Sequence, residues 1–170
     1  LSILLNYDID PVFSDEVLNE AQAIPQKVTD EQKIGRKDLT DLTIVTIDGD
    51  DAKDFDDAIS IEQTSNGFLL GVHIADVSYY VTKGSSLDNE ARNRGTSTYV
   101  VDRVVPMLPH VLSNGICSLN PNLERLTLTC MMNVDYEGNI VDYELFESVI
   151  KSKYRMTYNN VNKLFKNDKV

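Results

Sequence analysis

Six aspartates lie within ten consecutive residues of this chain, between Asp48 and Asp57. Two carboxylates about 4 Å apart repel each other by roughly 4 kcal/mol even at an effective dielectric near 20, so such a run is costly to fold. Lys53 is the one basic residue within the run. Divalent cations would supply the missing positive charge, and oxygen-rich sites suit Mg²⁺ or Ca²⁺. The residue types alone leave open a catalytic metal site, a structural calcium loop and a solvated acidic turn, although the EF-hand order of ligands is absent.

Apolar residues enclose the acidic run on both sides. Leu42–Ile47 and Ala58–Glu62 are rich in β-branched residues, which predicts two strands. Asp48 would end the first strand, and Asp54–Asp57 would lead into the second. An extended backbone would point alternate carboxylates to opposite faces, whereas a bend would bring three or four of them to one point.

His73 lies in an apolar stretch, where a hydrogen-bonded core or sheet-edge histidine is the favoured interpretation. Asp76, three residues later, could orient His73 or pair with Arg92 or Arg94, and structural pairing is favoured here too.

Tyrosines and arginines near the middle of the chain offer contacts for a nucleic acid. Tyr79, Tyr80 and Tyr99 could stack on bases, at roughly 1–3 kcal/mol per base. Arg92, Arg94 and Arg103 could hold phosphates. The alternatives are amphipathic residues at the edge of the core and charges that aid solubility.

Bulk properties indicate a globular protein of one domain with a real core. The chain has 170 residues and a net charge of −11, which argues against nucleic acid as a partner for the surface in general. No apolar run approaches the roughly 20 residues that span a bilayer, and no basic segment of a signal peptide precedes Leu1–Leu5. Cys117 and Cys130 are interpreted as reduced core thiols of a cytosolic protein.

The remaining pattern predicts an α+β fold, with a mostly antiparallel sheet or partial barrel and a few helices. The expected helices are Asp15–Ala23 after the cap Ser14, one opened by Ser85 and closed by Gly95, and one capped by Thr157. The other expected segments are a polar linker at 27–40, a hairpin turn at 64–67, a long strand at 68–81, an extended segment at 96–105, an irregular stretch at 112–121, and strands at 125–134 and 140–150.

An ordered set of segments resembles the catalytic domain of the ribonuclease II / ribonuclease R family of exoribonucleases, and looks closer to its ribonuclease R branch. The resemblance covers Asp41 to about Thr157. The segments are Thr46-Ile47-Asp48, Asp54-Phe55-Asp56-Asp57-Ala58, Val72-His73-Ile74-Ala75-Asp76-Val77-Ser78, Gly84-Ser85-Ser86-Leu87-Asp88, Arg94-Gly95-Thr96-Ser97-Thr98-Tyr99, Val105-Pro106-Met107-Leu108-Pro109 and Leu112-Ser113-Asn114-Gly115-Ile116-Cys117-Ser118-Leu119.

This resemblance implies processive 3′-to-5′ hydrolysis of RNA to nucleoside 5′-monophosphates, with Mg²⁺, or Mn²⁺ in its place, as the cofactor. It implies that Asp48, Asp54, Asp56 and Asp57 are the active-site aspartates, and that Tyr99 stacks on the base at the 3′ end. Asp48 and Asp57 are expected to be direct metal ligands. Asp54 and Asp56 are expected to hold a second metal or to orient the attacking water.

The resemblance also implies that this chain is a fragment. Residues 1–40 would connect to the catalytic domain, and 41–170 would be its N-terminal portion. Its C-terminal portion and the basic RNA-binding barrels would lie outside the chain, which answers the objection from net charge. The fragment is expected to bind Mg²⁺ weakly and to have little or no activity. A non-catalytic RNA- or partner-binding module with a structural metal, and a metal phosphatase or endonuclease, are the rival hypotheses.

Overall fold

A computed structural model describes residues 4, 6–7, 9–101 and 103–166 of the chain. The expectation about a signal peptide at Leu1–Leu5 concerns residues that lie mostly outside this part. The helical elements are α2 (Asp15–Ala23), η1 (Glu31–Lys33), α3 (Val77–Tyr80), α4 (Ser86–Arg94), η2 (Leu112–Ile116) and α5 (Tyr158–Phe165). The strands are β1 (Lys37–Asp38), β2 (Ile44–Asp48), β3 (Asp57–Thr64), β4 (Gly67–Ala75), β5 (Thr98–Val100), β6 (Arg103–Val105), β7 (Glu124–Asp135), β8 (Ile140–Lys151) and β9 (Tyr154–Thr157).

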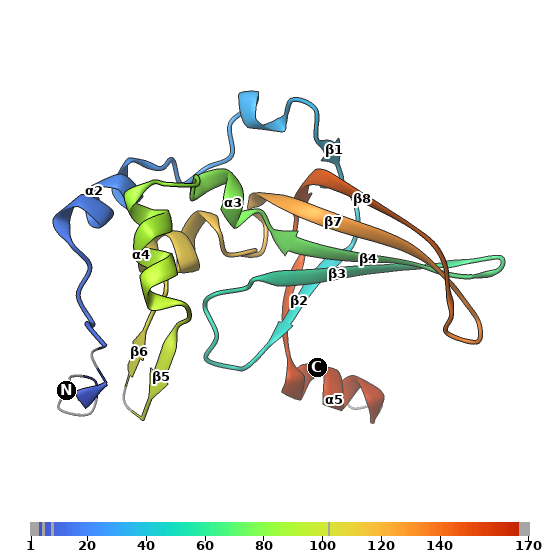
Figure 1. Ribbon diagram of the computed structural model, residues 1–170. Coiled ribbons are helices and arrows are strands. Elements are labelled where there is room, and N and C mark those ends of the chain that lie inside the picture. The colour runs from blue at the N-terminus through green and yellow to red at the C-terminus, as the bar shows by residue number, and fades with distance from the viewer. Residues whose placement is uncertain (1–3, 5, 8, 102, 167–170) are drawn as a thin grey trace.

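Within the described residues, one sheet of seven strands forms the centre of the fold, in the order β1-β8-β7-β4-β3-β2-β9. Its inner pairs are antiparallel, and the two edge strands β1 and β9 pair in parallel with β8 and β2. The β3–β4 and β7–β8 hairpins extend together to one side (Figure 1). The predicted α+β class with a mostly antiparallel sheet is therefore confirmed.

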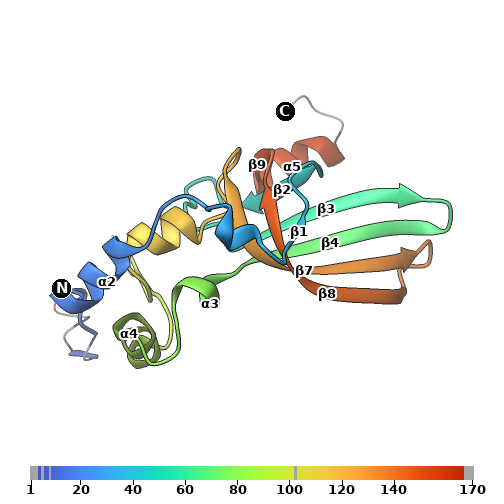
Figure 2. The same ribbon diagram turned by 90° about the horizontal axis from the view of Figure 1, so that it is seen from above.

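The helices α2 and α4, the η2 turn and the β5–β6 hairpin gather at the opposite end from the hairpin tips (Figure 2). One apolar core joins α2, α4 and η2 to the sheet, with Leu87, Leu112 and Leu126 at its centre. A second, smaller core lies beneath the acidic loop and includes Ile44, Phe55 and Leu119. No helix in the described ranges has the length and apolar character that would let it cross a membrane.

Local capping chemistry explains where the predicted helices begin. Ser14 accepts a hydrogen bond from the Val17 N–H, and Ser85 accepts one from the Asp88 N–H. Gly95 closes α4 with a φ of 70°, a conformation that favours glycine. The strands at 125–134 and 140–150 and the final helix after Thr157 are also found where they were predicted.

The long strand predicted for 68–81 is wrong in its second half. The strand ends at Ala75, and Asp76 caps the short helix α3 by accepting a hydrogen bond from the Tyr79 N–H at 3.2 Å. The apolar residues after Asp76 suggested a strand. The capping carboxylate instead turns the chain into α3, whose Tyr80 is buried in the core.

Two further segments are more regular than predicted. The extended segment at 96–105 is a two-stranded hairpin of β5 and β6, and the stretch at 112–121 contains the helical turn η2. Strands β1 and β9 were not predicted. β1 lies within the stretch expected to be a linker.

Candidate active site

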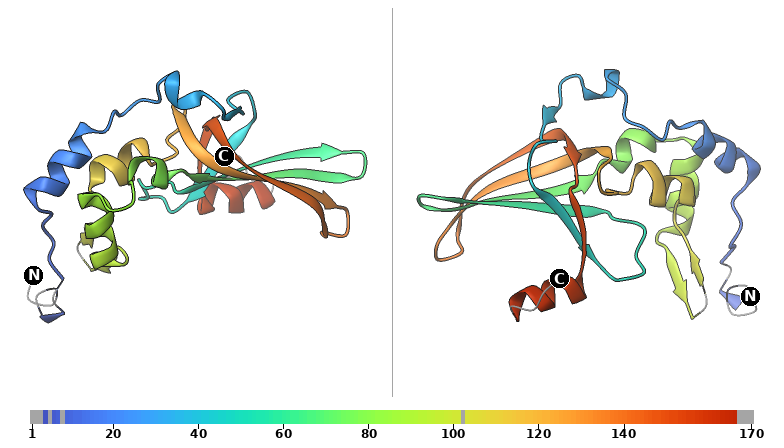
Figure 3. Two further views of the ribbon diagram at one scale, coloured as in Figure 1. Left: turned by 45° about the horizontal axis from the view of Figure 1, so that its top comes forward. Right: turned by 180° about the vertical axis from the view of Figure 1, so that it is seen from behind.

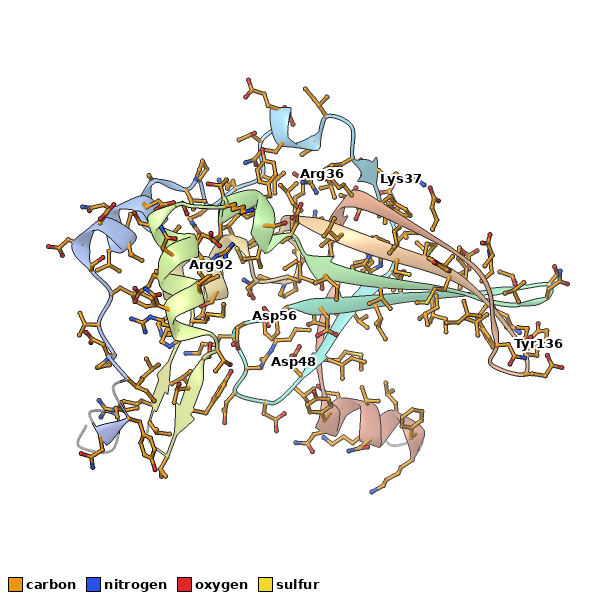
Figure 4. All side chains as sticks on the ribbon, viewed as in Figure 1. Arg36, Lys37, Asp48, Asp56, Arg92 and Tyr136 are labelled. Atoms are coloured by element: carbon orange, nitrogen blue, oxygen red, sulfur yellow. The ribbon has the colours of Figure 1, made fainter. Side chains whose placement is uncertain are left out.

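The acidic loop, residues 49–56, connects the adjacent antiparallel strands β2 and β3. Asp48 is the last residue of β2, as predicted, and Asp57 is the first residue of β3, one residue before the predicted start of that strand. The register pairs Ile44 with Ser60 and Val45 with Ile59, and beyond these pairs β2 continues to Asp48 along β9. Asp48 and Asp56 lie close together in Figure 4, where the two strands meet the loop. The loop therefore turns the chain back, so that Asp56 returns to the neighbourhood of Asp48.

The electrostatics show that the four predicted aspartates share one neighbourhood. Burial raises the pKa of Asp48, and the charges of Asp57 and Asp54 raise it further, while Arg155 opposes them. The pKa of Asp56 is also raised, first by loss of hydration and then by Asp54, Asp57 and Asp48. These carboxylates therefore repel one another, as expected of a site that a cation would neutralise.

Asp48 provides the clearest sign that this site suits a cation. Its Oδ2 atom is buried and has no hydrogen-bond partner within the described part of the chain. A buried carboxylate oxygen is costly unless a donor or a cation satisfies it. A hard divalent cation prefers carboxylate oxygens, so the donor set fits Mg²⁺. As the side chains stand, no group of three acidic, histidine or cysteine residues among those described is close enough to hold a metal ion. The carboxylates would have to converge when one binds.

Buried hydrogen bonds fix the end of the acidic loop that leads into β3. Ser118 Oγ accepts a hydrogen bond from the Phe55 N–H at 3.0 Å and donates one to the Lys53 carbonyl at 2.9 Å. The Leu119 N–H donates to the Phe55 carbonyl at 2.9 Å. Arg125, itself buried, holds the Ser118 carbonyl with its Nε at 2.7 Å. Phe55 is buried in the smaller core, so this end of the loop has a defined position.

Sequence reasoning missed the residues that hold the loop. Ser118 and Arg125 are ordinary residue types far from the aspartates along the chain. Arg155 contacts the other end of the loop from 105 positions away from Asp50. Only its positive charge, just before the predicted final helix, could have suggested a partner for the acidic run.

Tyr99 lies on the β5–β6 hairpin, and its side chain is 70% exposed. It lines a hollow of about 380 Å³ together with Asp54 and Lys53 from the acidic loop, and with His110 and Asn114 from the η2 region. The hollow has space for one nucleotide-sized group. The structure therefore brings Tyr99 and one of the four aspartates to the same cavity, although they are far apart in sequence.

The other candidate residues have structural partners. His73 is fully buried between two hydroxyl groups, with its Nε2 3.0 Å from Ser60 Oγ and its Nδ1 2.8 Å from Thr129 Oγ1. It is the core histidine that was favoured. Asp76 pairs with Arg36 at 2.6 Å, so the predicted structural pairing is confirmed but the predicted partners, Arg92 and Arg94, were wrong.

The two arginines named as phosphate contacts on α4 are engaged within the fold. Arg92 pairs with Asp88 at 3.1 Å, and Arg94 pairs with Glu90 at 2.8 Å while its guanidinium stacks over Phe13. Tyr79 and Tyr80 pack edge to face, and Tyr80 is buried. Burial raises the pKa of Cys117 to about 12, so this thiol remains protonated.

Comparison with known proteins finds the same fold and similar sequences. The RNB domain profile matches residues 36–170. Ribonuclease R of Thermotoga maritima is 56% identical over 164 residues, which cover 95% of this chain and 23% of that protein. Mycoplasma genitalium RNase R, solved in complex with ribose-methylated single-stranded RNA, superposes with a TM-score of 0.93 at 39% identity, covering 98% of this chain and 26% of that one. A structure of the same enzyme with double-stranded RNA gives the same TM-score and identity, covering 98% of this chain and 30% of that one. The chain thus spans about a quarter of the length of these relatives.

Proposed function

The chain belongs to the RNB domain family, and from this membership we propose that it forms part of the active site of a 3′-to-5′ exoribonuclease. The substrate is the 3′ end of single-stranded RNA, and the products are nucleoside 5′-monophosphates released processively. The observation that carries the proposal is the group of four mutually repelling aspartates around the buried, unpartnered Oδ2 of Asp48. The similarity to RNase R structures that contain RNA supports this substrate class.

Mg²⁺ is the proposed cofactor, and Mn²⁺ would substitute for it. When bound, such ions would supply Lewis acidity, which would activate a water and stabilise the leaving 3′ oxygen. Asp48 and Asp57 are the proposed direct ligands. Asp54 and Asp56 hold the second ion or orient the attacking water. The repulsion among these carboxylates favours cation binding, because each bound charge relieves several unfavourable contacts at once.

Tyr99 is proposed to stack on the base at the 3′ end. Its exposed ring borders the same hollow as Asp54, so a base against Tyr99 would bring the last phosphodiester towards the aspartates. Stacking of this kind contributes about 1–3 kcal/mol per base and tolerates any sequence. It therefore suits an enzyme that must advance along RNA without choosing among bases.

An Asp56→Asn variant of the full-length protein tests the proposal on single-stranded RNA. The change keeps the size of the side chain and removes one charge, and we expect turnover to fall by at least about a hundredfold. Asp142→Asn is the matched control, because Asp142 lies on β8 in the extended hairpin and accepts a hydrogen bond from the N–H of the neighbouring Tyr143. Near-normal turnover by Asp56→Asn would exclude the assigned role. Products from 3′-blocked and 5′-blocked RNA separate this activity from that of an endonuclease or a phosphatase.

The 170-residue chain by itself is expected to bind Mg²⁺ weakly and to degrade RNA little or not at all. Basic RNA-binding barrels, as the resemblance implies, would lie in other parts of a full-length protein and supply the positive surface that this chain lacks. The cytoplasm is the proposed site of action. Rapid processive decay of RNA by the 170-residue chain would contradict this assignment.

A further inference from the structure

Arg155 approaches the acidic loop from strand β9 and contacts its first half, whereas Ser118 contacts Lys53 and Phe55 in its second half. Its Nη2 lies 2.5 Å from the Asp50 carbonyl oxygen, 3.3 Å from that of Ala52 and 3.4 Å from that of Gly49. Its guanidinium carbon lies 5.3 Å from the centre of the Phe55 ring. One side chain therefore contacts four residues of the loop that connects Asp48 to Asp56.

The position of β9 places Arg155 beside the strand that carries Asp48. β9 pairs in parallel with β2, and the register sets Thr157 beside Asp48. The same strand thus borders the first aspartate of the site and carries the arginine that holds the turn after it. At the start of α5, Asn159 adds a second tether by donating to Asp50 Oδ2 at 2.6 Å. Figure 3 shows β9 and α5 alongside β2 at this end of the sheet.

The contacts of Arg155 are with backbone carbonyls and an aromatic ring, not with the four aspartate side chains. This pattern differs from that of a counter-ion, which would pair with the carboxylates themselves. A guanidinium is planar and stacks on aromatic rings, so Arg155 can share the two N–H groups of its Nη2 among the three carbonyls while it lies against Phe55. The arrangement is that of a side chain that fixes the path of a loop.

From these contacts we infer that Arg155 is a positioning residue, which holds residues 49–52 so that the aspartates on either side can converge on a cation. This inference rests on the proposed function for its metal, but the loop geometry is testable without one. Partners that orient metal ligands typically change metal affinity by about 10–100-fold when they are removed. Arg155 is expected to fall at the lower end of that range, because Ser118 fixes the other end of the loop independently.

Charge and positioning make opposite predictions for this residue. As a cation beside the aspartates, Arg155 repels Mn²⁺, so its removal would raise metal affinity if charge were its only contribution. As a tether, it pre-orders the ligands, so its removal would lower the affinity. Arg155→Lys separates the two effects, because it keeps the charge and loses the planar set of donors.

The experiment compares Arg155→Lys and Arg155→Met with the unaltered 170-residue chain, using Mn²⁺ affinity by electron paramagnetic resonance. Amide hydrogen exchange of Ala52, whose N–H donates to the Gly49 carbonyl, is measured in the metal-free proteins. Exchange of Val72 in the central strand β4 reports on the whole fold. Arg92→Lys is the matched control, since Arg92 pairs with Asp88 within its own helix, away from the acidic loop.

We expect both Arg155 variants to bind Mn²⁺ about tenfold more weakly, and Ala52 to exchange faster by a similar factor, with Val72 and the Arg92 control unchanged. The inference is overturned if Arg155→Met binds Mn²⁺ more tightly while Arg155→Lys is unaffected, because Arg155 would then act only as a charge. It is also overturned if Ala52 exchange does not change, or if Val72 exchange rises equally. If the unaltered chain binds no Mn²⁺, the proposed metal site fails, and Ala52 exchange alone still decides whether Arg155 holds the loop.

Discussion

At the scale of single residues, His73 shows how a buried titratable group makes stability depend on pH. Its ring is enclosed by strands β3, β4 and β7, and its two nitrogens hydrogen-bond to the hydroxyls of Ser60 and Thr129. Burial lowers the pKa of His73 to about 4. The folded protein therefore keeps His73 neutral over a pH range in which an unfolded chain would protonate it.

Stability should fall as the pH drops from about 6.5 towards 4. Above the unfolded pKa the histidine is neutral in both states, and the full contribution is present. Between the two pKa values only the unfolded chain takes up the proton, so the free energy of unfolding falls by up to about 3 kcal/mol. Urea unfolding at several pH values measures the slope. A His73→Gln variant should lose this part of the pH dependence, and an unchanged slope in that variant would contradict the assignment.

The ion pair of Arg36 and Asp76 is the most buried in the described part of the chain. Their side chains are 3% and 5% exposed, and their closest atoms are 2.6 Å apart. Arg36→Met should lower the free energy of unfolding by about 3–5 kcal/mol, because it leaves the Asp76 carboxylate buried without its partner. Lys37→Met removes the neighbouring pair with Glu144, which is exposed, and should cost less than about 1 kcal/mol. Denaturant titration compares the two, and equal losses would contradict this reasoning.

At the scale of elements, the acidic loop is held in place by segments from the second half of the sequence. The turn between η2 and β7 supplies Ser118, and β9 supplies Arg155, so the loop is held from two directions. Neither segment carries an acidic ligand of its own. The site is therefore a product of the sheet topology, which brings the ends of β7 and β9 to the β2–β3 connection.

Ser118→Ala tests the first of these supports. The change leaves the Phe55 N–H without its acceptor and the Lys53 carbonyl without its donor, in a place where Ser118 is fully buried. We expect a loss of about 1–3 kcal/mol in the free energy of unfolding, measured by thermal or urea denaturation. Ser86→Ala, which removes an exposed hydroxyl contact with Glu16, is the control and should stay within about 0.5 kcal/mol. If Ser118→Ala left the free energy of unfolding unchanged, the hydroxyl would not be needed to satisfy the Phe55 N–H and the Lys53 carbonyl.

Elements with local signals could be predicted from sequence, and elements that depend on distant partners could not. Ser14, Ser85 and Gly95 mark helix ends through hydrogen bonds or backbone angles within a few residues. Strand β1 has two residues and exists because Lys37 pairs with Ser148, more than a hundred positions away. Strand β9 likewise requires β2. No local periodicity could have indicated either strand.

The same distinction between local signals and distant partners applies to the candidate site. The four aspartates and the strands beside them were visible in sequence, because residue type and β-branched flanks are local properties. Three other features of the site could not be seen in the sequence, since each depends on residues from the second half of the chain. They are the burial of Asp48, the hydrogen bonds from Ser118 and the contacts of Arg155. The shared hollow of Tyr99 and Asp54 arises in the same way, because the β5–β6 hairpin and the acidic loop line one cavity although they are separate in sequence.

At the scale of the whole molecule, the two faces of the sheet differ in character. The registers place a set of large apolar side chains on one face, here called the outer face: Ile61, Ile74, Leu128, Tyr143, Leu145 and Tyr154. All six are exposed, and Leu145 is 70% exposed. The opposite face carries the buried hydroxyl and histidine network around His73. Exposed apolar surface that continues across so many strands is unusual for a monomer and favours association.

The 170-residue chain should therefore self-associate as its concentration rises, through burial of the outer face. Burial of apolar area contributes about 25 cal/mol per Å², so a few large side chains per copy are enough to drive association at high concentration. Leu145→Lys introduces a charge on the outer face, on strand β8, and should shift association to markedly higher concentration. Ser65→Lys adds the same charge at the β3–β4 turn and should change association much less, which separates the loss of apolar contact from a general increase in solubility. Light scattering over a concentration series measures both. The outer face does not drive association if the unaltered chain stays monomeric at high concentration. The same conclusion follows if the two variants associate alike.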